Sequence, residues 1–490
     1  MKISKKNEVY LVIETEPSIG RELSDFFTFE VPGARFMPQY KSRVWDGKIR
    51  LFNQMNGELY VGLLPYVEEF AKRNDINIEY LEGVIDDEQL RDGELDLFVR
   101  RVKPRSRGKS IQVRSYQMDA ISHAIGNNRS LLLSPTASGK SLIIYILSVW
   151  YAMKTEKNIL ILVPTTSLVE QMHSDFIDYG FQESMMQKIY QGYSKNITKP
   201  ITISTWQSLY KMPKKWFEQF SCILGDEVHI FKSKSLTGIM NKLHLCKYRH
   251  GFTGTLDGTQ THRLVLEGLF GAVNRVTTSK ELMDSNTLAK LNIKCLVLKY
   301  PEADCKFMKD QGFQDEVDLI VRDQRRNKFI VDLTKHLKGN TLVLFQFVEK
   351  HGSELYAQMR DAIDSNRKVF YVYGGTDTDT REEIRAITEK ENDAVIVASY
   401  GTFSTGINIR NLHNCVFASP SKSRIRVLQS IGRALRQGDN KDSATLYDIA
   451  DDFTYKSRQN FTLRHFMERI NIYNEEEFDY EINKISIEKG

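Results

Sequence analysis

An apolar run passes directly into a loop of small residues at positions 131–141, which read LLLSPTASGKS. Leu131 to Leu133 has the composition of a buried strand, and Gly139-Lys140-Ser141 opens an apolar stretch that is typical of a helix. In a strand–loop–helix unit, the backbone N–H groups at the start of the helix converge on phosphate oxygens. The stretch therefore predicts a phosphate-binding loop, set in a parallel α/β sheet.

The side chains of this loop have separate expected roles. We expect Lys140 to reach the β- and γ-phosphates of a nucleotide and the Ser141 hydroxyl to bind Mg²⁺. Ser134 and Ala137 stand where such loops usually carry glycine. Ala137 adds only a Cβ, so phosphate binding should survive if φ is negative there. The other loop residues expected around the nucleotide are Thr136, Ala137, Ser138 and Gly139.

A second apolar run ends in two carboxylates, at Cys222 to Leu224 followed by Gly225-Asp226-Glu227-Val228-His229. Asp226 is placed to act at the Mg²⁺ ion, and Glu227 to orient and deprotonate the attacking water. An Asp-Glu pair at the end of a strand is also common as a helix cap. The phosphate loop upstream favours the catalytic interpretation.

Strand-like apolar runs alternate with helical stretches twice along the chain, which predicts two parallel-sheet lobes. We expect a small mixed α/β domain at 1–100, a nucleotide-binding lobe at 101–285, and a second lobe with C-terminal helices at 286–490. The runs in the first lobe are 131–133, 159–163, 201–203 and 222–224; those in the second are 296–298, 341–345, 368–372, 394–398 and 415–417.

The first 100 residues have weaker patterns. They predict a strand at 9–13, a capped helix at 18–27, and a hairpin at 35–52 whose tip carries Trp45-Asp46-Gly47. Residues 35–50 interleave basic and aromatic side chains, which suits contact with phosphates and bases. Arg43, Trp45 and Lys48 are the candidates for that contact. The alternative, that Trp45 and Phe36 fill the core of a small domain, stays open.

The bulk composition of the chain excludes few classes of function. The net charge of the 490 residues is +5, but a basic block at 100–114 follows an acid-rich stretch at 68–96. This block is either a solvated linker or a surface that follows a phosphate backbone. The five cysteines are scattered, so a disulfide framework or zinc ribbon is not expected. No signal peptide or membrane span is predicted, and we expect a soluble intracellular protein.

Two arginines, Arg433 and Arg436, lie three residues apart in the stretch QSIGRALR at 429–436. This spacing places both on one face of a helix. Such arginines are usually part of an exposed, salt-bridged face. Together with the two nucleotide motifs, they indicate cations that stabilise charge on a transferring phosphoryl group.

In order, these motifs resemble those of the superfamily 2 helicases with a DExH box, over residues 105–450. The resemblance implies two RecA-like lobes that use ATP and Mg²⁺. Phe252-Thr253-Gly254-Thr255 stands at motif III, where Ser-Ala-Thr is commoner. The implied nucleotide contacts outside the phosphate loop are Arg114, Gln117, Gly406, Asn408 and Gln429. The implied nucleic-acid contacts in the two lobes are Thr165, Thr205, Phe345, Ser399 and Thr402.

The whole chain most resembles the recombination helicases of T-even phages. The resemblance implies a monomeric DNA motor in the host cytoplasm that unwinds and remodels forks, Holliday junctions, D-loops and R-loops. Its partners would be branched and duplex DNA and RNA–DNA hybrids. An RNA helicase, or the motor of a nuclease or restriction system, remains as an alternative.

Overall fold

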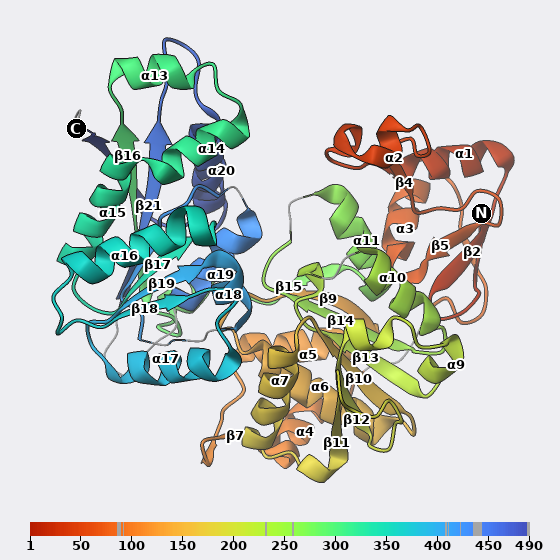
Figure 1. The fold of residues 1–490 in the computed structure, drawn as a ribbon. Coiled ribbons are helices and arrows are strands. Elements are labelled where there is room, and N and C mark those ends of the chain that lie inside the picture. Colours follow the sequence, from red (N-terminus) through yellow and green to blue (C-terminus); the bar gives the residue numbers. More distant parts are fainter. Residues whose placement is uncertain are drawn as a thin grey trace. The chain divides into compact units, whose positions relative to one another are not determined.

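The computed structural model describes residues 1–490 except 86–89, 92, 231–232, 257–258, 407–408, 410, 422, 435–442 and 488–490 (Figure 1). Its contacts divide the chain into two compact units. One holds residues 1–134 and 139–277, and the other holds residues 135–138 and 278–490.

The N-terminal domain is built on a mixed sheet of strand order β5-β2-β1-β6. β1 pairs antiparallel with β2 and parallel with β6. Strand β2 and helix α1 confirm two of the predicted elements, but α1 starts at Pro17, one residue before the predicted start, because proline suits the first turn of a helix. The elements are β1 (Lys2–Lys5), β2 (Tyr10–Glu14), α1 (Pro17–Phe26), β5 (Glu58–Tyr60), η2 (Val61–Leu63), α3 (Leu64–Arg73) and β6 (Glu79–Tyr80).

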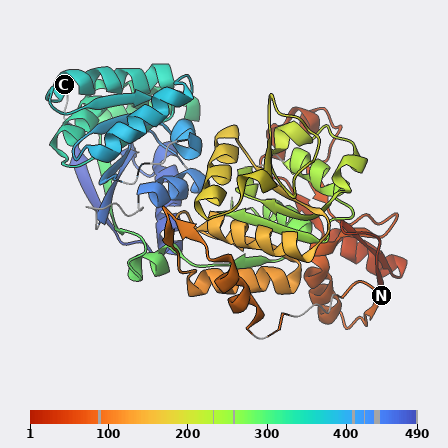
Figure 2. The ribbon, with the colours of Figure 1, turned by 90° about the horizontal axis from the view of Figure 1, so that it is seen from below.

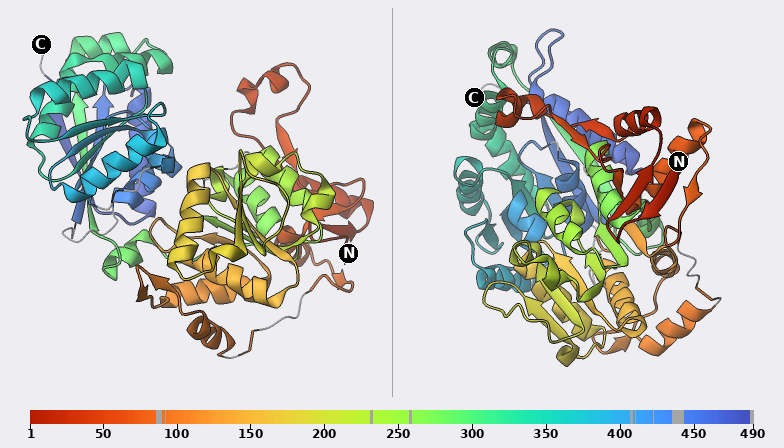
Figure 3. Two further views of the ribbon diagram at one scale, coloured as in Figure 1. Left: turned by 60° about the horizontal axis from the view of Figure 1, so that its bottom comes forward. Right: turned by 90° about the vertical axis from the view of Figure 1, so that its right-hand side faces the viewer.

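The predicted hairpin at 35–52 is wrong in its detail. The antiparallel ribbon pairs β3 (Thr28–Glu30) with β4 (Lys48–Arg50). Its connecting loop carries the short helices η1 (Ala34–Phe36) and α2 (Pro38–Lys41), and it projects from the domain (Figure 3). Prolines 32 and 38 lack the N–H that a strand needs, so the loop folds into helical turns instead. Trp45 to Gly47 therefore lie at the base of β4 and not at a tip.

The first lobe is a parallel sheet of seven described strands, in the order β11-β12-β10-β13-β14-β9-β15. Helices α5, α6 and α7 pack on one face and α8 to α11 on the other (Figure 2). Each face has its own apolar core. The strands are β9 (Arg129–Leu133), β10 (Asn158–Val163), β11 (Met186–Ile189), β12 (Ile201–Thr205), β13 (Phe220–Gly225), β14 (Tyr248–Thr253) and β15 (Val273–Arg275). The helices are α5 (Ser115–Asn127), α6 (Lys140–Lys154), α7 (Thr166–Asp178), η3 (Glu183–Met185), α8 (Trp206–Leu209), α9 (Lys214–Phe217), η4 (Val228–Ile230), α10 (Ser233–Lys242) and α11 (Gln260–Phe270).

The N-terminal domain packs directly on this lobe through η2, α3 and α11. The Tyr66 hydroxyl donates a hydrogen bond of 2.6 Å to the buried carboxylate of Glu267. Arg129 at the start of β9 forms an ion pair of 2.8 Å with Glu8. Leu264 of α11 belongs to the apolar core of the domain. Helix α4 (Glu94–Val102) and the hairpin β7 (Arg105–Ser106) and β8 (Lys109–Ser110) follow, so the basic block is folded and is not a bare linker.

The second lobe is also a parallel sheet of seven described strands, in the order β18-β19-β17-β20-β21-β16-β22. Both lobes confirm the predicted α/β class. The strands are β16 (Lys290–Lys299), β17 (Thr341–Phe345), β18 (Val369–Val372), β19 (Val395–Ser399), β20 (Asn414–Phe417), β21 (Ser443–Asp452) and β22 (Tyr480–Ser486). The helices are α12 (Ser279–Asp284), α13 (Glu302–Met308), α14 (Phe313–Arg322), α15 (Gln324–His336), η5 (Val348–Gly352), α16 (Ser353–Ala362), α17 (Thr378–Lys390), α18 (Tyr400–Gly406), α19 (Arg424–Ala434) and α20 (Phe461–Glu475).

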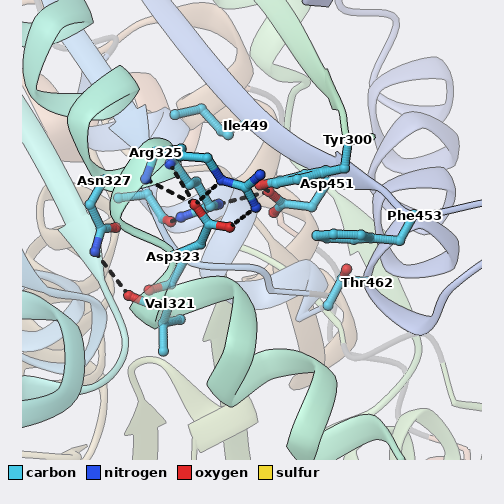
Figure 4. A network of polar contacts seen from close by, with 12 residues as sticks. Tyr300, Val321, Asp323, Arg325, Asn327, Ile449, Asp451, Phe453 and Thr462 are labelled. Atoms are coloured by element: carbon cyan, nitrogen blue, oxygen red, sulfur yellow. Dashed lines mark hydrogen bonds and ion pairs between the residues drawn. The ribbon is translucent and has the colours of Figure 1, made fainter. Parts of the chain in front are cut away.

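A buried ion pair joins α15 to β21 inside this lobe. Arg326 Nε donates to Asp451 at 2.7 Å, and both side chains are fully buried. The Tyr300 hydroxyl also donates to Asp451 (Figure 4). The end of this lobe was predicted to form C-terminal helices. It forms α20 and then β22, which pairs with β16. Most of its side chains are exposed, so β22 carries no apolar pattern.

Candidate nucleotide and nucleic-acid sites

The phosphate loop leaves β9 and turns into α6 through two left-handed residues. The backbone φ is 68° at Ala137 and 84° at Gly139. The negative φ that was the condition at Ala137 is therefore not met. An alanine in this left-handed conformation costs about 1–2 kcal/mol. The Ser138 hydroxyl donates to the Pro135 carbonyl at 2.7 Å and closes the turn. The loop backbone has the αL residues and the helix N-terminus that an anion site needs.

Gln117 packs directly against this loop. Its side-chain oxygen accepts a hydrogen bond from the Arg114 backbone N–H at 3.0 Å, which caps the start of α5. A Cβ built on Gly139 would lie 2.3 Å from the Gln117 amide nitrogen. Gly139 therefore meets two demands at once, a positive φ and a close approach of Gln117. The Arg114 guanidinium donates to the Tyr116 hydroxyl.

The two carboxylates at the end of β13 meet the lysine of the loop. Lys140 Nζ lies 2.6 Å from Glu227 Oε1. Asp226 accepts the Glu227 backbone N–H at 2.9 Å and is buried. Burial raises the pKa of Asp226 to about 6; Lys140 opposes this increase, and the charge of Glu227 adds to it. Lys140, Asp226 and Glu227 thus lie together as predicted. The buried carboxylate of Asp226 lacks a full countercharge.

A chain of polar contacts continues from Glu227 to motif III. His229 Nδ1 lies 3.4 Å from Glu227 Oε2 and 2.6 Å from Thr253 Oγ1. The Thr253 hydroxyl donates its proton to the Thr255 carbonyl, so His229 must donate to Thr253 from a protonated Nδ1. The Ser134 backbone N–H also donates to the Thr253 carbonyl at 2.8 Å. The phosphate loop, the carboxylate pair at the end of β13 and motif III thus form one connected network within the first lobe.

The Ser141 hydroxyl has a partner that no sequence motif indicated. It lies 3.0 Å from the phenol oxygen of Tyr179, which directly follows α7. Burial raises the pKa of Tyr179 to about 12, so the phenol stays protonated at neutral pH. An isolated tyrosine after a helix carries no sequence signal for such a role.

A cleft of about 480 Å³ opens at the carboxyl ends of β17, β18 and β19 in the second lobe. Two cations line it, Arg381 of α17 and Arg426 of α19, and no acidic residue does. Arg381 donates to the Gly374 carbonyl at 3.1 Å, while its Nε is buried without a hydrogen-bond partner. Neither arginine was singled out from the sequence. The other lining residues are Gln346, Val348, Gly374, Ser399, Tyr400, Gly401 and Thr402.

The five predicted contact residues in the lobes fall into different settings. Phe345 is fully buried and stacks on Tyr371, so its side chain belongs to the core. Thr165 caps α7 by accepting the Leu168 N–H. The remaining hydroxyls are buried in local pairs, Thr205 with Ser208 at 2.9 Å and Ser399 with Thr402 at 2.8 Å.

The projecting loop of the N-terminal domain exposes its cations and two apolar side chains. Arg43 and Lys48 are exposed, while Trp45 is half-buried and donates its ring N–H to the Lys48 carbonyl at 2.8 Å. Phe36 is 80% exposed and Val44 is 82% exposed, so Phe36 does not fill a core. The alternative of a core role for Phe36 is thereby excluded.

Some predicted site residues fall outside the described part of the chain. Asn408 and Arg436 do, and so does the side chain of Arg433 in α19. Gly406 is the last residue of α18, and Gln429 is half-buried in α19.

Three family models match the chain in order. They are the N-terminal domain of DNA helicase UvsW (residues 1–81), the res subunit of type III restriction enzymes (110–258) and the helicase conserved C-terminal domain (325–438). In the part of the chain that the structure describes, no helix has both the length and the apolar composition of a membrane span.

Known proteins extend this similarity to the full chain. The ATP-dependent DNA helicase UvsW of Enterobacteria phage T4 is 35% identical over 97% of each chain. The crystal structure of T4 UvsW covers 99% of each chain with a TM-score of 0.54. The DNA 3'-5' translocase XPB2 of Sulfurisphaera tokodaii is 24% identical over 68% of this chain and 80% of its own. The motif order, the two parallel-sheet lobes and the full-length identity place this chain in the UvsW family of superfamily 2 ATP-dependent DNA helicases.

Proposed function

We propose that this protein is an ATP-driven DNA helicase and translocase that unwinds and remodels branched DNA in recombination and repair. The observation that carries the proposal is the similarity to T4 UvsW over 97% of each chain, N-terminal domain included. The family model of the type III restriction res subunit matches residues 110–258 alone. Forks, four-way junctions, D-loops and R-loops are the proposed substrates, and a monomer in the host cytoplasm is the proposed form.

The first lobe would hold ATP with Mg²⁺. Lys140 and the left-handed loop suit the phosphates, and the oxygen donors Ser141 and Asp226 suit Mg²⁺. Burial disfavours the charged form of Asp226. A divalent cation would supply the countercharge, so the residues fit the group. The metal would neutralise charge on the transferring phosphoryl group.

Glu227 is the proposed base for the attacking water. Its ion pair with Lys140 is a contact that the phosphates would compete for, because they attract the same ammonium group. Arg433 and Arg436 are the proposed cations from the second lobe. Glu227→Gln should bind nucleotide yet lose turnover, and Arg433→Ala should bind ATP and hydrolyse it slowly. Normal turnover in either variant would remove that role.

Each lobe would contact a nucleic-acid strand at the carboxyl edge of its own sheet. The cleft of the second lobe has two arginines and no acid, which suits phosphates and carries no sequence information. Binding should therefore depend steeply on salt and little on base sequence. ATPase activity titrated with double-stranded DNA, single-stranded DNA and RNA tests the choice of DNA. Stronger stimulation by RNA would favour the RNA-helicase alternative.

We propose that residues 1–100 form the domain that selects branched or duplex DNA. The support is the projecting loop, which exposes Phe36, Val44 and Arg43, and which leads into the exposed Lys48 of β4. Reversing the charge of Lys41, Arg43 and Lys48 together should weaken binding to forks and four-way junctions more than binding to single strands. Lys72→Glu on α3 is the control, since Lys72 is exposed on the same domain away from this loop. Parent-like fork binding by the triple variant would exclude the loop as the junction reader.

A further inference from the structure

Tyr179 touches the proposed metal-binding serine from outside every recognised motif. Its phenol oxygen lies 3.0 Å from Ser141 Oγ. Ser141 is the second residue of α6, directly after the lysine of the phosphate loop. The Ser141 hydroxyl therefore already has one side-chain partner within the protein.

Tyr179 is held in place by the packing of its ring and by a hydrogen bond of its backbone. Its centroid lies 5.3 Å from that of Tyr145, one helical turn after Ser141 on the same face of α6. Tyr145 in turn packs edge-on against Phe176 of α7 at 5.2 Å. The Tyr179 backbone N–H donates to the Asp175 carbonyl at 2.9 Å and closes α7. The ring is thus a fixed part of the α6–α7 packing and not a mobile surface group.

The basic hairpin of β7 and β8 fixes the same turn from the other side. The Arg105 backbone N–H donates to the Tyr179 carbonyl at 3.2 Å. The Asp178 carboxylate accepts the Ser106 hydroxyl at 2.8 Å and the Arg107 backbone N–H at 2.7 Å. Three hydrogen bonds from β7 and its turn therefore set the position of residues 178 and 179.

A hydroxyl binds a cation through its oxygen, so its proton must point to an acceptor elsewhere. The phenol oxygen lies within reach of that proton. Partners of this kind set the direction in which a metal ligand points, and their loss typically costs about 10–100-fold in metal affinity. We propose that Tyr179 is a positioning residue that orients the Ser141 hydroxyl for the Mg²⁺ of the bound nucleotide. The inference rests on the proposed role of Ser141 as a metal ligand.

Nucleotide affinity with and without the metal tests this role. The dissociation constant of a non-hydrolysable ATP analogue is measured for Tyr179→Phe in saturating Mg²⁺ and in EDTA. We expect an affinity about 10-fold weaker in Mg²⁺ and unchanged in EDTA. Tyr190→Phe is the matched control, because it removes a phenol hydroxyl that binds Glu170 in the same unit. Thermal unfolding of both variants reports on the fold.

Ser141→Ala separates this inference from the proposed metal site. In that background Tyr179→Phe should add no further loss, because it acts through the serine. An additional loss there, or an equal loss in Mg²⁺ and EDTA, would mean that the tyrosine serves the fold alone. Unchanged or tighter binding of Tyr179→Phe in Mg²⁺ would also overturn the inference. If Ser141→Ala kept full Mg²⁺ dependence, the metal role of Ser141 would itself fail.

Discussion

Glu227→Gln should lower the pKa of Asp226 in the nucleotide-free protein. The pKa of Asp226 is raised from 3.8 to about 6, chiefly by burial. At ~1.4 kcal/mol per pH unit, this is a penalty of roughly 3 kcal/mol on its charged form. The charge of Glu227 contributes less to it than burial does. Removing that charge should therefore move the midpoint down, by less than the full rise from 3.8 to about 6.

The assay is the gain in nucleotide affinity on adding Mg²⁺, followed from pH 8 down to about pH 4.5. A protonated Asp226 cannot ligate a cation, so the gain should be present above about pH 6 in the parent and lost as the pH falls through it. In Glu227→Gln the loss should come at lower pH. In Lys140→Ala it should come at higher pH, because Lys140 favours the charged form. A midpoint in Glu227→Gln at or above the parent value would refute this electrostatic account.

Three further substitutions test the packing around the sites. Gly139→Ala should weaken nucleotide binding at least 10-fold, because its Cβ would lie 2.3 Å from Gln117 at a φ of 84°; Gly126→Ala, with open space around it, should leave binding unchanged. Ala137→Gly should raise the free energy of unfolding by about 1 kcal/mol, because glycine adopts a positive φ without the strain of an alanine. A lower free energy of unfolding in urea denaturation would contradict the positive φ. Arg326→Met should cost about 3–5 kcal/mol, since it leaves Asp451 charged and buried, whereas Arg385→Ala on the surface should cost about 0–1 kcal/mol.

Central strands were predictable because a parallel sheet covered on both faces needs continuous apolar runs. The run at 341–345 coincides with β17. Strand β14 was missed because it contains Arg249 and His250, which interrupt the apolar pattern although both are fully buried. The Arg249 guanidinium is accommodated by carbonyl groups, among them that of Cys246 at 3.0 Å. Such compensation depends on residues brought together by the fold, so no local pattern indicates it.

The nucleotide site was more predictable than the nucleic-acid site, for a physical reason. Lys140 and Glu227 follow strands β9 and β13 of one parallel sheet, whose carboxyl ends share an edge, so the chain order alone brings them together. Contacts with a phosphate backbone need only cations and N–H groups, which many residues provide. Arg381 and Arg426 of the cleft therefore carry no distinctive spacing. The role of Phe345 could not be decided from the sequence, because an apolar residue at a strand end is equally suited to the core.

The backbone conformation of the site was the property that the sequence predicted least well. Ala137 and Glu227 both have positive φ, 68° and 50°, although neither is glycine. Non-glycine residues in this region cost of order 1–3 kcal/mol and persist only where the surroundings hold them. At Glu227 the Asp226 carboxylate accepts its N–H, and Lys140 binds its side chain. These contacts direct the Glu227 carboxylate toward the phosphate loop. The same contacts therefore hold the strained backbone and orient the proposed base. The same contacts would change when a nucleotide competes for Lys140, which makes Glu227 the residue of the first lobe that is best placed to respond to ATP.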